Sequence, residues 1–179
     1  MSEMIGGRYR LERQLGVGGM AQVWLAHDTQ LDREVALKLL GADADPLRFE
    51  REAQAIASLS HPNICRLFDY GRADDRPYMV FEHLPGGTLD DRLPPGQPLN
   101  DAESERIAAE FADELAHAHE PGLVRRVLKP TNIIFDEEGR AKITDFGIAR
   151  MTGADTLTDA GTLMGTAAYM SPEQAQGEE

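Results

Sequence analysis

Residues 132–147, NIIFDEEGRAKITDFG, form the stretch of this sequence that decides its fold. Two short apolar segments, 132–135 and 141–144, flank the polar turn DEEGR, and this pattern predicts a tight hairpin of two strands. The hairpin places Asn132 and Asp145 at the two strand ends, where both side-chain oxygens can point at one place. Mg²⁺ prefers oxygen ligands and usually bridges to substrate phosphates, so the pair indicates a magnesium–phosphate site. Taken one at a time, Asn132 could be a turn residue and Asp145 a helix cap.

The glycine-rich stretch LGVGGMAQV, residues 15–23, is a candidate phosphate-binding loop between strands predicted at 8–16 and 22–28. Glycine lets the backbone approach a phosphate closely and leaves N–H groups free to bind its oxygens. Because a strand rather than a helix follows, a dinucleotide-binding turn of the Rossmann type is excluded. Taken alone, the loop is better explained as an ordinary hairpin turn.

The segment REVALKLL, residues 33–40, predicts a strand in which Ala36 and Lys38 share one face. A helix is predicted over 46–59, with Glu52 on its apolar stripe. A carboxylate in that position needs a cationic partner, and Lys38 is the natural candidate. The alternatives are a solvated strand lysine and a glutamate at the helix rim that reaches into solvent.

The rest of the pattern adds a strand pair and a long helix. Apolar segments 64–70 and 78–84 predict two strands joined by a polar turn at 71–76. The clearest helix is predicted over 101–119, where apolar residues recur at helical spacing. The Pro- and Gly-rich stretch 85–99 separates these groups and is the best candidate for a boundary between two lobes.

Composition and charge narrow the function classes. The net charge of −13, from 31 acidic and 18 basic residues, disfavours nucleic acid as a partner, because binding to its phosphates needs clustered Lys and Arg. Cys65 is the single cysteine, which fits a reducing, cytoplasmic setting. The first residues lack the apolar core of a signal peptide, and no stretch approaches the roughly 18 apolar residues of a membrane span.

As an ordered set, these motifs resemble the eukaryotic-type protein kinases, in particular their bacterial serine/threonine branch. LVRRVLKPTN, residues 123–132, stands where that family has its His-Arg-Asp catalytic loop, and DFGIAR, residues 145–150, matches directly. GTAAYMSPEQ, residues 165–174, matches the end of the activation segment, with Ser171 in place of the alanine of the Ala-Pro-Glu motif. The resemblance covers the chain from about Tyr9 and is specific as a set, whereas any one motif alone is not.

The resemblance implies an α+β, protein-kinase-like fold of two lobes. Residues 1–84 correspond to the small lobe, with its sheet, one helix and the hinge. Residues 85–179 correspond to part of the large lobe, with the catalytic loop, the DFG motif and the activation segment. Because that lobe continues in the family beyond the Ala-Pro-Glu motif, the resemblance also implies that the C-terminal lobe is incomplete, or truncated, in a chain ending at Glu179.

The resemblance further implies ATP and Mg²⁺ as cofactors. It assigns the adenine site to three kinds of residue. Some pack against the two faces of the base, one lies at the inner end of the site, and others form hydrogen bonds with the edge of the base through their backbone. These are Val23, Ala36 and Ile134 for the sandwich, Phe81 as the gatekeeper, and Glu82 and Leu84 for the edge.

The same resemblance assigns the phosphate and metal contacts. Gly16 and Gly18 cover the phosphates, and Lys38 holds two of them while Glu52 orients it. Lys129 reaches the γ-phosphate, and Asn132 and Asp145 hold Mg²⁺.

One departure from the family concerns the chemistry itself. Val127 occupies the position of the catalytic Asp, and Arg125 that of the preceding His. Valine cannot accept a proton, and a positioned general base contributes about 10²–10⁴-fold to a rate. We therefore expect impaired or absent phosphotransfer.

Three functional hypotheses follow. The first is an active serine/threonine kinase acting on a protein substrate. The second is a pseudokinase that binds nucleotide and acts through a signalling partner, and the third is the non-functional product of an interrupted kinase gene. The oligomeric state stays open.

A regulatory hypothesis concerns Thr158 and Thr162, which lie between the DFG and Ser-Pro-Glu motifs, where relatives are phosphorylated. A phosphate there could pair with Arg126. The alternative is that both threonines are simply polar loop residues.

Overall fold

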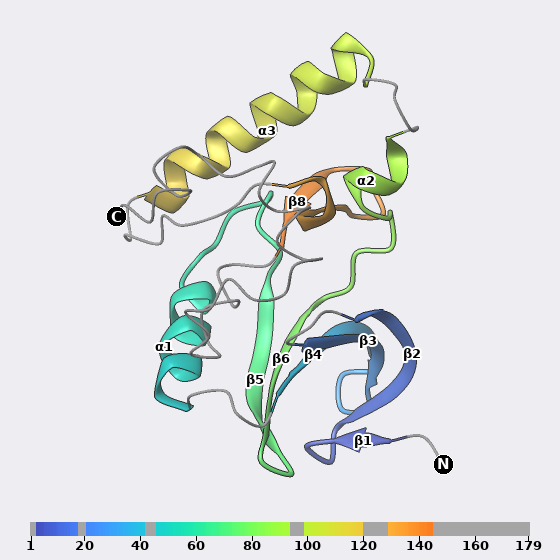
Figure 1. Cartoon of the computed structure of the whole chain (residues 1–179), viewed down its shortest axis with the longest axis vertical. Coiled ribbons are helices and arrows are strands. Elements are labelled where there is room, and N and C mark those ends of the chain that lie inside the picture. Colours follow the sequence, from blue (N-terminus) through green and yellow to red (C-terminus); the bar gives the residue numbers. More distant parts are fainter. Residues whose placement is uncertain (1–2, 18–20, 42–45, 94–98, 120–128, 145–179) are drawn as a thin grey trace, which may run out of the picture.

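The computed structural model describes residues 3–17, 21–41, 46–93, 99–119 and 129–144. A curled sheet with one helix beside it occupies one end, and a group made of two helices and a small hairpin occupies the other (Figure 1). Among the described residues, no helix is long and apolar enough to cross a membrane.

The large sheet is antiparallel throughout, and its strand order is β1-β2-β3-β4-β6-β5. Its strands are β1 (Met4–Ile5), β2 (Tyr9–Val17), β3 (Ala21–Asp28), β4 (Arg33–Leu40), β5 (Leu67–Ala73) and β6 (Arg76–Glu82). Side-chain alternation in β4 is confirmed: Val35 and Leu37 are fully buried in the sheet core, while Ala36 and Lys38 are only partly buried on the opposite face.

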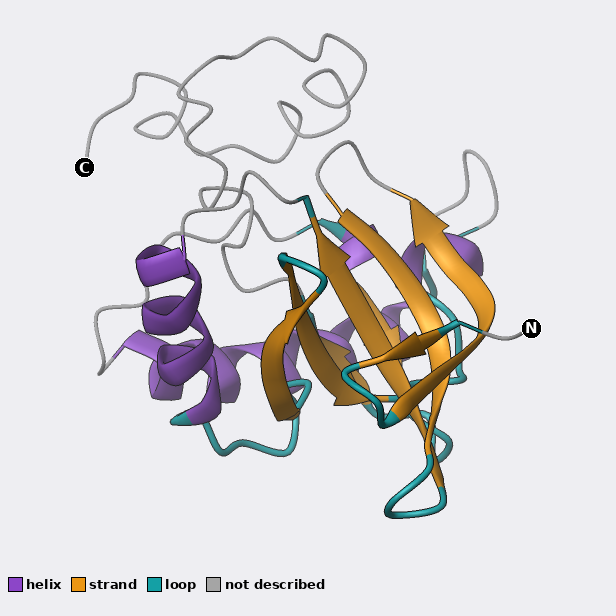
Figure 2. Cartoon of the chain, turned by 90° about the horizontal axis from the view of Figure 1, so that it is seen from below, coloured by secondary structure: helices purple, strands orange, loops and turns teal. Residues whose placement is uncertain are grey.

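The helix α1 (Pro46–Ala57) lies beside the sheet (Figure 2). Its apolar stripe, Phe49, Ala53 and Ile56, is buried in a core shared with β4 and β6. The predicted helix extended to Leu59, but α1 ends at Ala57. The chain tightens there, with the Leu59 N–H donating to the Ile56 carbonyl over three residues, while the Leu59 side chain stays buried.

The turn predicted at 71–76 is present but shorter than predicted, because β5 ends only at Ala73 and β6 already begins at Arg76. The turn consists of Asp74 and Asp75, which both have positive φ, 48° and 61°, as in a tight two-residue hairpin. Gly71 lies inside β5 for a packing reason. A Cβ atom there would lie 2.7 Å from the hydroxyl of Tyr78, its partner on β6.

The second group contains α2 (Leu89–Arg92), α3 (Asp101–His119), the 3₁₀ turn η1 (Pro130–Asn132), β7 (Ile133–Phe135) and β8 (Ala141–Ile143). Both strands of the predicted hairpin are confirmed, with Phe135 and Ala141 buried. The short helix α2 lies inside the predicted boundary stretch and was not predicted from the sequence. Thr88 caps it, because its hydroxyl accepts from the Asp91 N–H and the Asp91 carboxylate accepts from the Thr88 N–H.

The β7–β8 hairpin contacts both the helices of its own group and the segment before β5 in the large sheet. Its strand β7 forms a bridge with Thr88 ahead of α2, and its strand β8 forms one with Ile64, which lies just before β5. The carboxylate of Glu110 on α3 accepts from the Ala141 N–H at 3.1 Å. The hairpin is therefore the piece that joins the large sheet to the helices.

Candidate functional site

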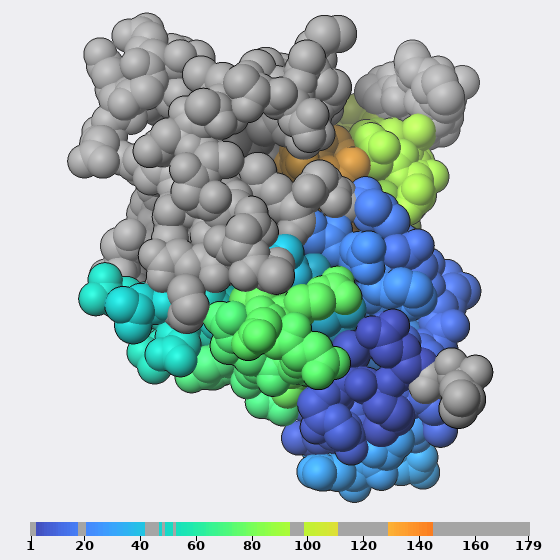
Figure 3. Space-filling view, turned by 60° about the horizontal axis from the view of Figure 1, so that its bottom comes forward, coloured from blue at the N-terminus to red at the C-terminus, as the bar shows by residue number. Residues whose placement is uncertain are grey.

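A cavity of about 260 Å³ lies between the large sheet and the hairpin. Figure 3 shows the hairpin region (orange) next to residues around α2 (yellow-green) and above strands of the N-terminal half (blue). The lining residues come from both groups of elements. They are Leu15, Gly16, Val23, Ala36, Lys38, Cys65, Phe81, Glu82, His83, Leu84, Thr131, Ile134 and Thr144.

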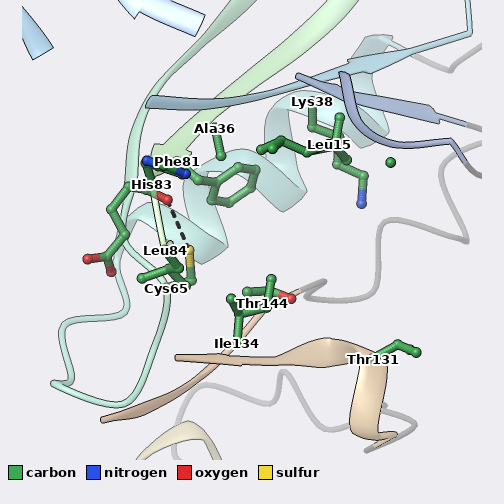
Figure 4. Close-up of a pocket in the computed structure, with 13 residues that line it drawn as sticks. Leu15, Ala36, Lys38, Cys65, Phe81, His83, Leu84, Thr131, Ile134 and Thr144 are labelled. Carbon is green, nitrogen blue, oxygen red and sulfur yellow. Dashed lines mark hydrogen bonds between the residues drawn. The ribbon is translucent and has the colours of Figure 1, made fainter. Parts of the chain in front are cut away.

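The sheet supplies one wall. Val23 on β3 and Lys38 on β4 are direct neighbours in the strand register, and Ala36 lies two residues before Lys38 on the same face. The small side chain of Ala36 leaves room next to it. Lys38 lies at the end of the cavity away from His83 and Leu84 (Figure 4), so its ammonium group provides positive charge at that end.

The end of β6 and the residues after it form the inner edge. Phe81 is 9% exposed and pairs with Ala36 across β4 and β6. The Glu82 N–H is used within the fold, donating to the Arg66 carbonyl at 3.0 Å, and the Glu82 carbonyl receives a weak contact from Cys65 Sγ at 3.9 Å. Within the described part of the chain, the backbone N–H of Leu84 makes no hydrogen bond. This edge thus offers a carbonyl at Glu82 and an N–H at Leu84.

The hairpin supplies the opposite wall, with Ile134 from β7 and Thr144 after β8. The Thr144 N–H donates to the Asn132 carbonyl at 2.8 Å, and its hydroxyl donates to the same oxygen at 3.2 Å. Asn132 is therefore held directly beside the residue that precedes Asp145. Lys129 comes just before η1, and its carbonyl accepts from the Asn132 N–H at 2.9 Å.

Most described candidates gather at this cavity. Gly16, Val23, Ala36, Lys38, Phe81, Glu82, Leu84 and Ile134 line it. Asn132 directly follows its lining residue Thr131, and Lys129 precedes that residue by two positions.

The remaining candidates lie outside the described residues. They are Gly18, Val127, Asp145, Thr158 and Thr162, together with Arg125 and Arg126. Glu52 lies on α1, but its side chain is outside the described part, so its ion pair with Lys38 stays a prediction.

Five lining residues were missed in the sequence: Leu15, Cys65, His83, Thr131 and Thr144. Leu15, Thr131 and Thr144 are sequence neighbours of predicted contacts, and that adjacency was a usable signal. Cys65 had no local signal. It reaches the cavity because its N–H donates to the Ile143 carbonyl, a contact across 78 residues of chain.

The cavity fits a flat apolar group that has a polar edge and an anionic tail. Ala36 lies across it from Ile134 and Lys38 lies at the far end (Figure 4), while Val23 also lines the sheet side and the inner edge presents backbone hydrogen-bonding groups. The amide oxygen of Asn132 and the carboxylate of Asp145 are oxygen donors of the type that Mg²⁺ prefers. The cavity therefore fits a nucleotide, and these two residue types suit Mg²⁺, although Asp145 lies outside the described residues.

Comparisons with known proteins point the same way. The profile of the family described as "Protein kinase domain" matches residues 9–179. Serine/threonine-protein kinase PrkC of Bacillus subtilis is 43% identical over 182 residues, which cover 99% of this chain and 28% of that protein. Probable serine/threonine-protein kinase SCO3848 of Streptomyces coelicolor is 44% identical over 186 residues, again covering 28% of its length.

The fold itself is similar to a solved kinase domain. The crystal structure of a cysteine-to-alanine mutant of the Mycobacterium tuberculosis PknI kinase domain has a TM-score of 0.75 and 28% identity, covering 99% of this chain and 68% of that one. This likeness confirms the α+β, protein-kinase-like fold predicted from the sequence. The chain spans 28% of the length of the two curated relatives above.

Proposed function

The chain belongs to the serine/threonine protein kinase family, and from that premise we propose that its cavity binds ATP together with Mg²⁺. In this proposal residues 1–84 act as the small lobe and hinge, and residues 85–179 act as part of the large lobe. The observation that carries the proposal is the convergence of β3, β4, the end of β6 and the β7–β8 hairpin on one cavity.

The adenine would lie between Val23 and Ala36 on one side and Ile134 on the other. Its edge would bond to the Glu82 carbonyl and the Leu84 N–H. Such an arrangement combines an apolar sandwich with a few directed polar groups, as small-molecule sites usually do.

The phosphates would extend toward Lys38 and the glycine loop, with Lys129 near the terminal phosphate. Asn132 and Asp145 would hold Mg²⁺, which neutralises phosphate charge when bound. The chain's own residues would thus bind and orient the triphosphate.

The weak point of the phosphotransfer hypothesis is Val127, because a hydrocarbon side chain can neither accept a proton nor orient a hydroxyl. We therefore propose a domain that binds ATP–Mg²⁺ with impaired transfer to protein Ser or Thr. Val127 also favours a second candidate, a pseudokinase that acts on a signalling partner through its nucleotide-dependent shape. Both assign the chain to the cytoplasm, where ATP is present and a thiol such as Cys65 stays reduced.

Isothermal titration calorimetry tests the nucleotide proposal. Wild-type chain should bind ATP with Mg²⁺, and Ala36→Leu should remove most of that binding, because the larger side chain would occupy the space for the base. Ala57→Leu, the same change at the exposed C-terminal end of α1, is the matched control and should bind as wild type does. Folded wild-type chain that binds no ATP, or Ala36→Leu with unchanged affinity, would contradict the proposal.

A radiolabel transfer assay on a generic protein substrate separates the two candidates. The impaired kinase should show slow, Mg²⁺-dependent incorporation that depends on Lys38. A pseudokinase should bind ATP with no incorporation above the Lys38→Met background.

A further inference from the structure

An ion pair between Lys142 and Glu82 joins the hairpin to the end of the large sheet. The Lys142 ammonium lies 2.7 Å from Glu82 Oε2, and the two side chains are only 12% and 20% exposed. Lys142 lies on β8, and Glu82 is the last residue of β6. The pair therefore links two separate sheets that form opposite sides of the cavity.

Glu82 is held by more than this one contact. Its other carboxylate oxygen, Oε1, accepts from the Arg66 N–H at 2.7 Å, and its own N–H donates to the Arg66 carbonyl at 3.0 Å. With both carboxylate oxygens and the backbone N–H engaged, little freedom remains at the residue whose carbonyl belongs to the proposed adenine edge.

The strand β8 is fixed from its other side. The Ile143 N–H donates to the Asn63 carbonyl at 2.8 Å, and the Cys65 N–H donates to the Ile143 carbonyl at 3.0 Å. The buried Asn63 amide also donates to the Ala141 carbonyl at 2.8 Å. Successive side chains of a strand alternate in direction, so Lys142 points away from buried Ala141 and Ile143.

We propose that Lys142 is a positioning residue for nucleotide binding, acting through Glu82. This inference rests on the proposed function, in which the Glu82 carbonyl and the Leu84 N–H receive the adenine. The pair holds that edge in place relative to β8, which leads directly to Thr144 and Asp145. It thereby sets where the adenine end of the site lies relative to Thr144 and Asn132 before the ligand arrives, and preorganisation of this kind strengthens binding.

A competing explanation is that Lys142 merely attracts the phosphates by its charge. The two explanations differ for a ligand without phosphates. If Lys142 acts by positioning, loss of the ion pair should weaken the binding of adenosine and of ADP alike. Simple charge attraction predicts that adenosine is unaffected and that Glu82→Gln, which removes a negative charge, strengthens ADP binding.

Calorimetric titration of the 179-residue chain with adenosine and with ADP–Mg²⁺ decides between them. Lys142→Met and Glu82→Gln should each lower the affinity for adenosine by roughly fivefold, which is at the low end of coupling between separate sites. Lys142→Arg keeps the ion pair and should stay near wild type. The control is Arg140→Met, on the same hairpin, which breaks an ion pair with Asp136 of 2.9 Å and should leave both affinities unchanged.

Glu82→Gln keeps the test valid if Lys142→Met does not fold, because the glutamine has the same shape and can still accept from the Arg66 N–H. Unchanged adenosine affinity in the folded Glu82→Gln variant would overturn the inference while leaving the nucleotide site intact. Wild-type chain that binds neither ligand would overturn the proposed function, and this inference with it.

Discussion

The ion pairs Arg8–Asp28 and Lys142–Glu82 show two different uses of partly buried charge. The Asp28 carboxylate is fully buried, and Arg8 donates to both of its oxygens at 2.7 Å. The Asp28 carboxylate also accepts a hydrogen bond from the backbone N–H of Gln30 at 3.1 Å. All these partners belong to neighbouring strands and turns of one sheet, so this cluster fixes the internal geometry of that sheet.

The pair of Glu82 and Lys142 is built from fewer contacts but spans two sheets. Loss of this pair would change the position of the two sheets relative to each other, whereas each sheet would still form. We therefore expect the first pair to matter mainly for stability and the second mainly for the cavity. Single substitutions can test that separation because stability and ligand affinity are measured independently.

The largest effect is expected for Arg8→Met, which removes the closer of the two cations of the buried Asp28 carboxylate and leaves it only Arg33, whose Nε is 3.7 Å from Oδ2. Breaking a buried pair from one side usually costs about 3 kcal/mol or more, so we expect a loss of that order in the free energy of unfolding. Chemical denaturation measures it. Adenosine affinity of the folded fraction should be unchanged, and a loss of affinity with little loss of stability would reverse the comparison.

Acid should weaken the same cluster in a defined pH window. The hydrogen bonds from Arg8 lower the pKa of Asp28 from 3.8 to about 2, despite burial, which opposes the shift. A lowered carboxyl pKa contributes stability above the unfolded value of 3.8 that is lost as the pH falls toward 2. The contribution is about 2 kcal/mol. Asp28→Asn should flatten the pH dependence of unfolding between these values, and a variant that keeps the wild-type slope would contradict this assignment.

A smaller effect, measured as ligand affinity, is expected for Lys38→Met. Lys38 lies at the end of the cavity away from the proposed adenine edge. Its loss should therefore lower the affinity for ADP–Mg²⁺ by about tenfold, which is the effect of losing one charge-assisted hydrogen bond. Adenosine binding should not change. Paired titrations measure this, and the contrast with Lys142→Met, which should weaken both ligands, separates phosphate contact from positioning.

The smallest effect is expected at an exposed pair. Arg106 and Glu110 lie 2.7 Å apart on α3, with side chains 43% and 21% exposed. Arg106→Met should lower the free energy of unfolding by no more than about 0.5 kcal/mol, because solvent screens such pairs. Adenosine affinity should stay at the wild-type value. A loss comparable to that of Arg8→Met would show that burial does not explain the difference between the pairs.

Much of the fold was predictable because local pattern and tertiary environment agree. In β4 the alternation that predicted one buried face is the one observed, with Val35 and Leu37 fully buried. The hairpin of β7 and β8 was likewise predicted from two apolar segments and a polar turn. The turn between β5 and β6 was predicted with bounds that are too wide, because Gly71 was counted in the turn, whereas the reason for glycine there is the hydroxyl of Tyr78 on the neighbouring strand.

The sequence by itself determined the family, the strands that carry Ala36 and Lys38, and the chemical types at the phosphate end of the site. These depend on residue order and on the two-residue period of a strand, which are properties of neighbouring residues. Only the tertiary structure decided that Cys65 lines the cavity and that Lys142 meets Glu82 across 60 residues of chain. Contacts of that kind depend on how β8 docks against residues 63–65, and no local pattern of side chains encodes such a docking.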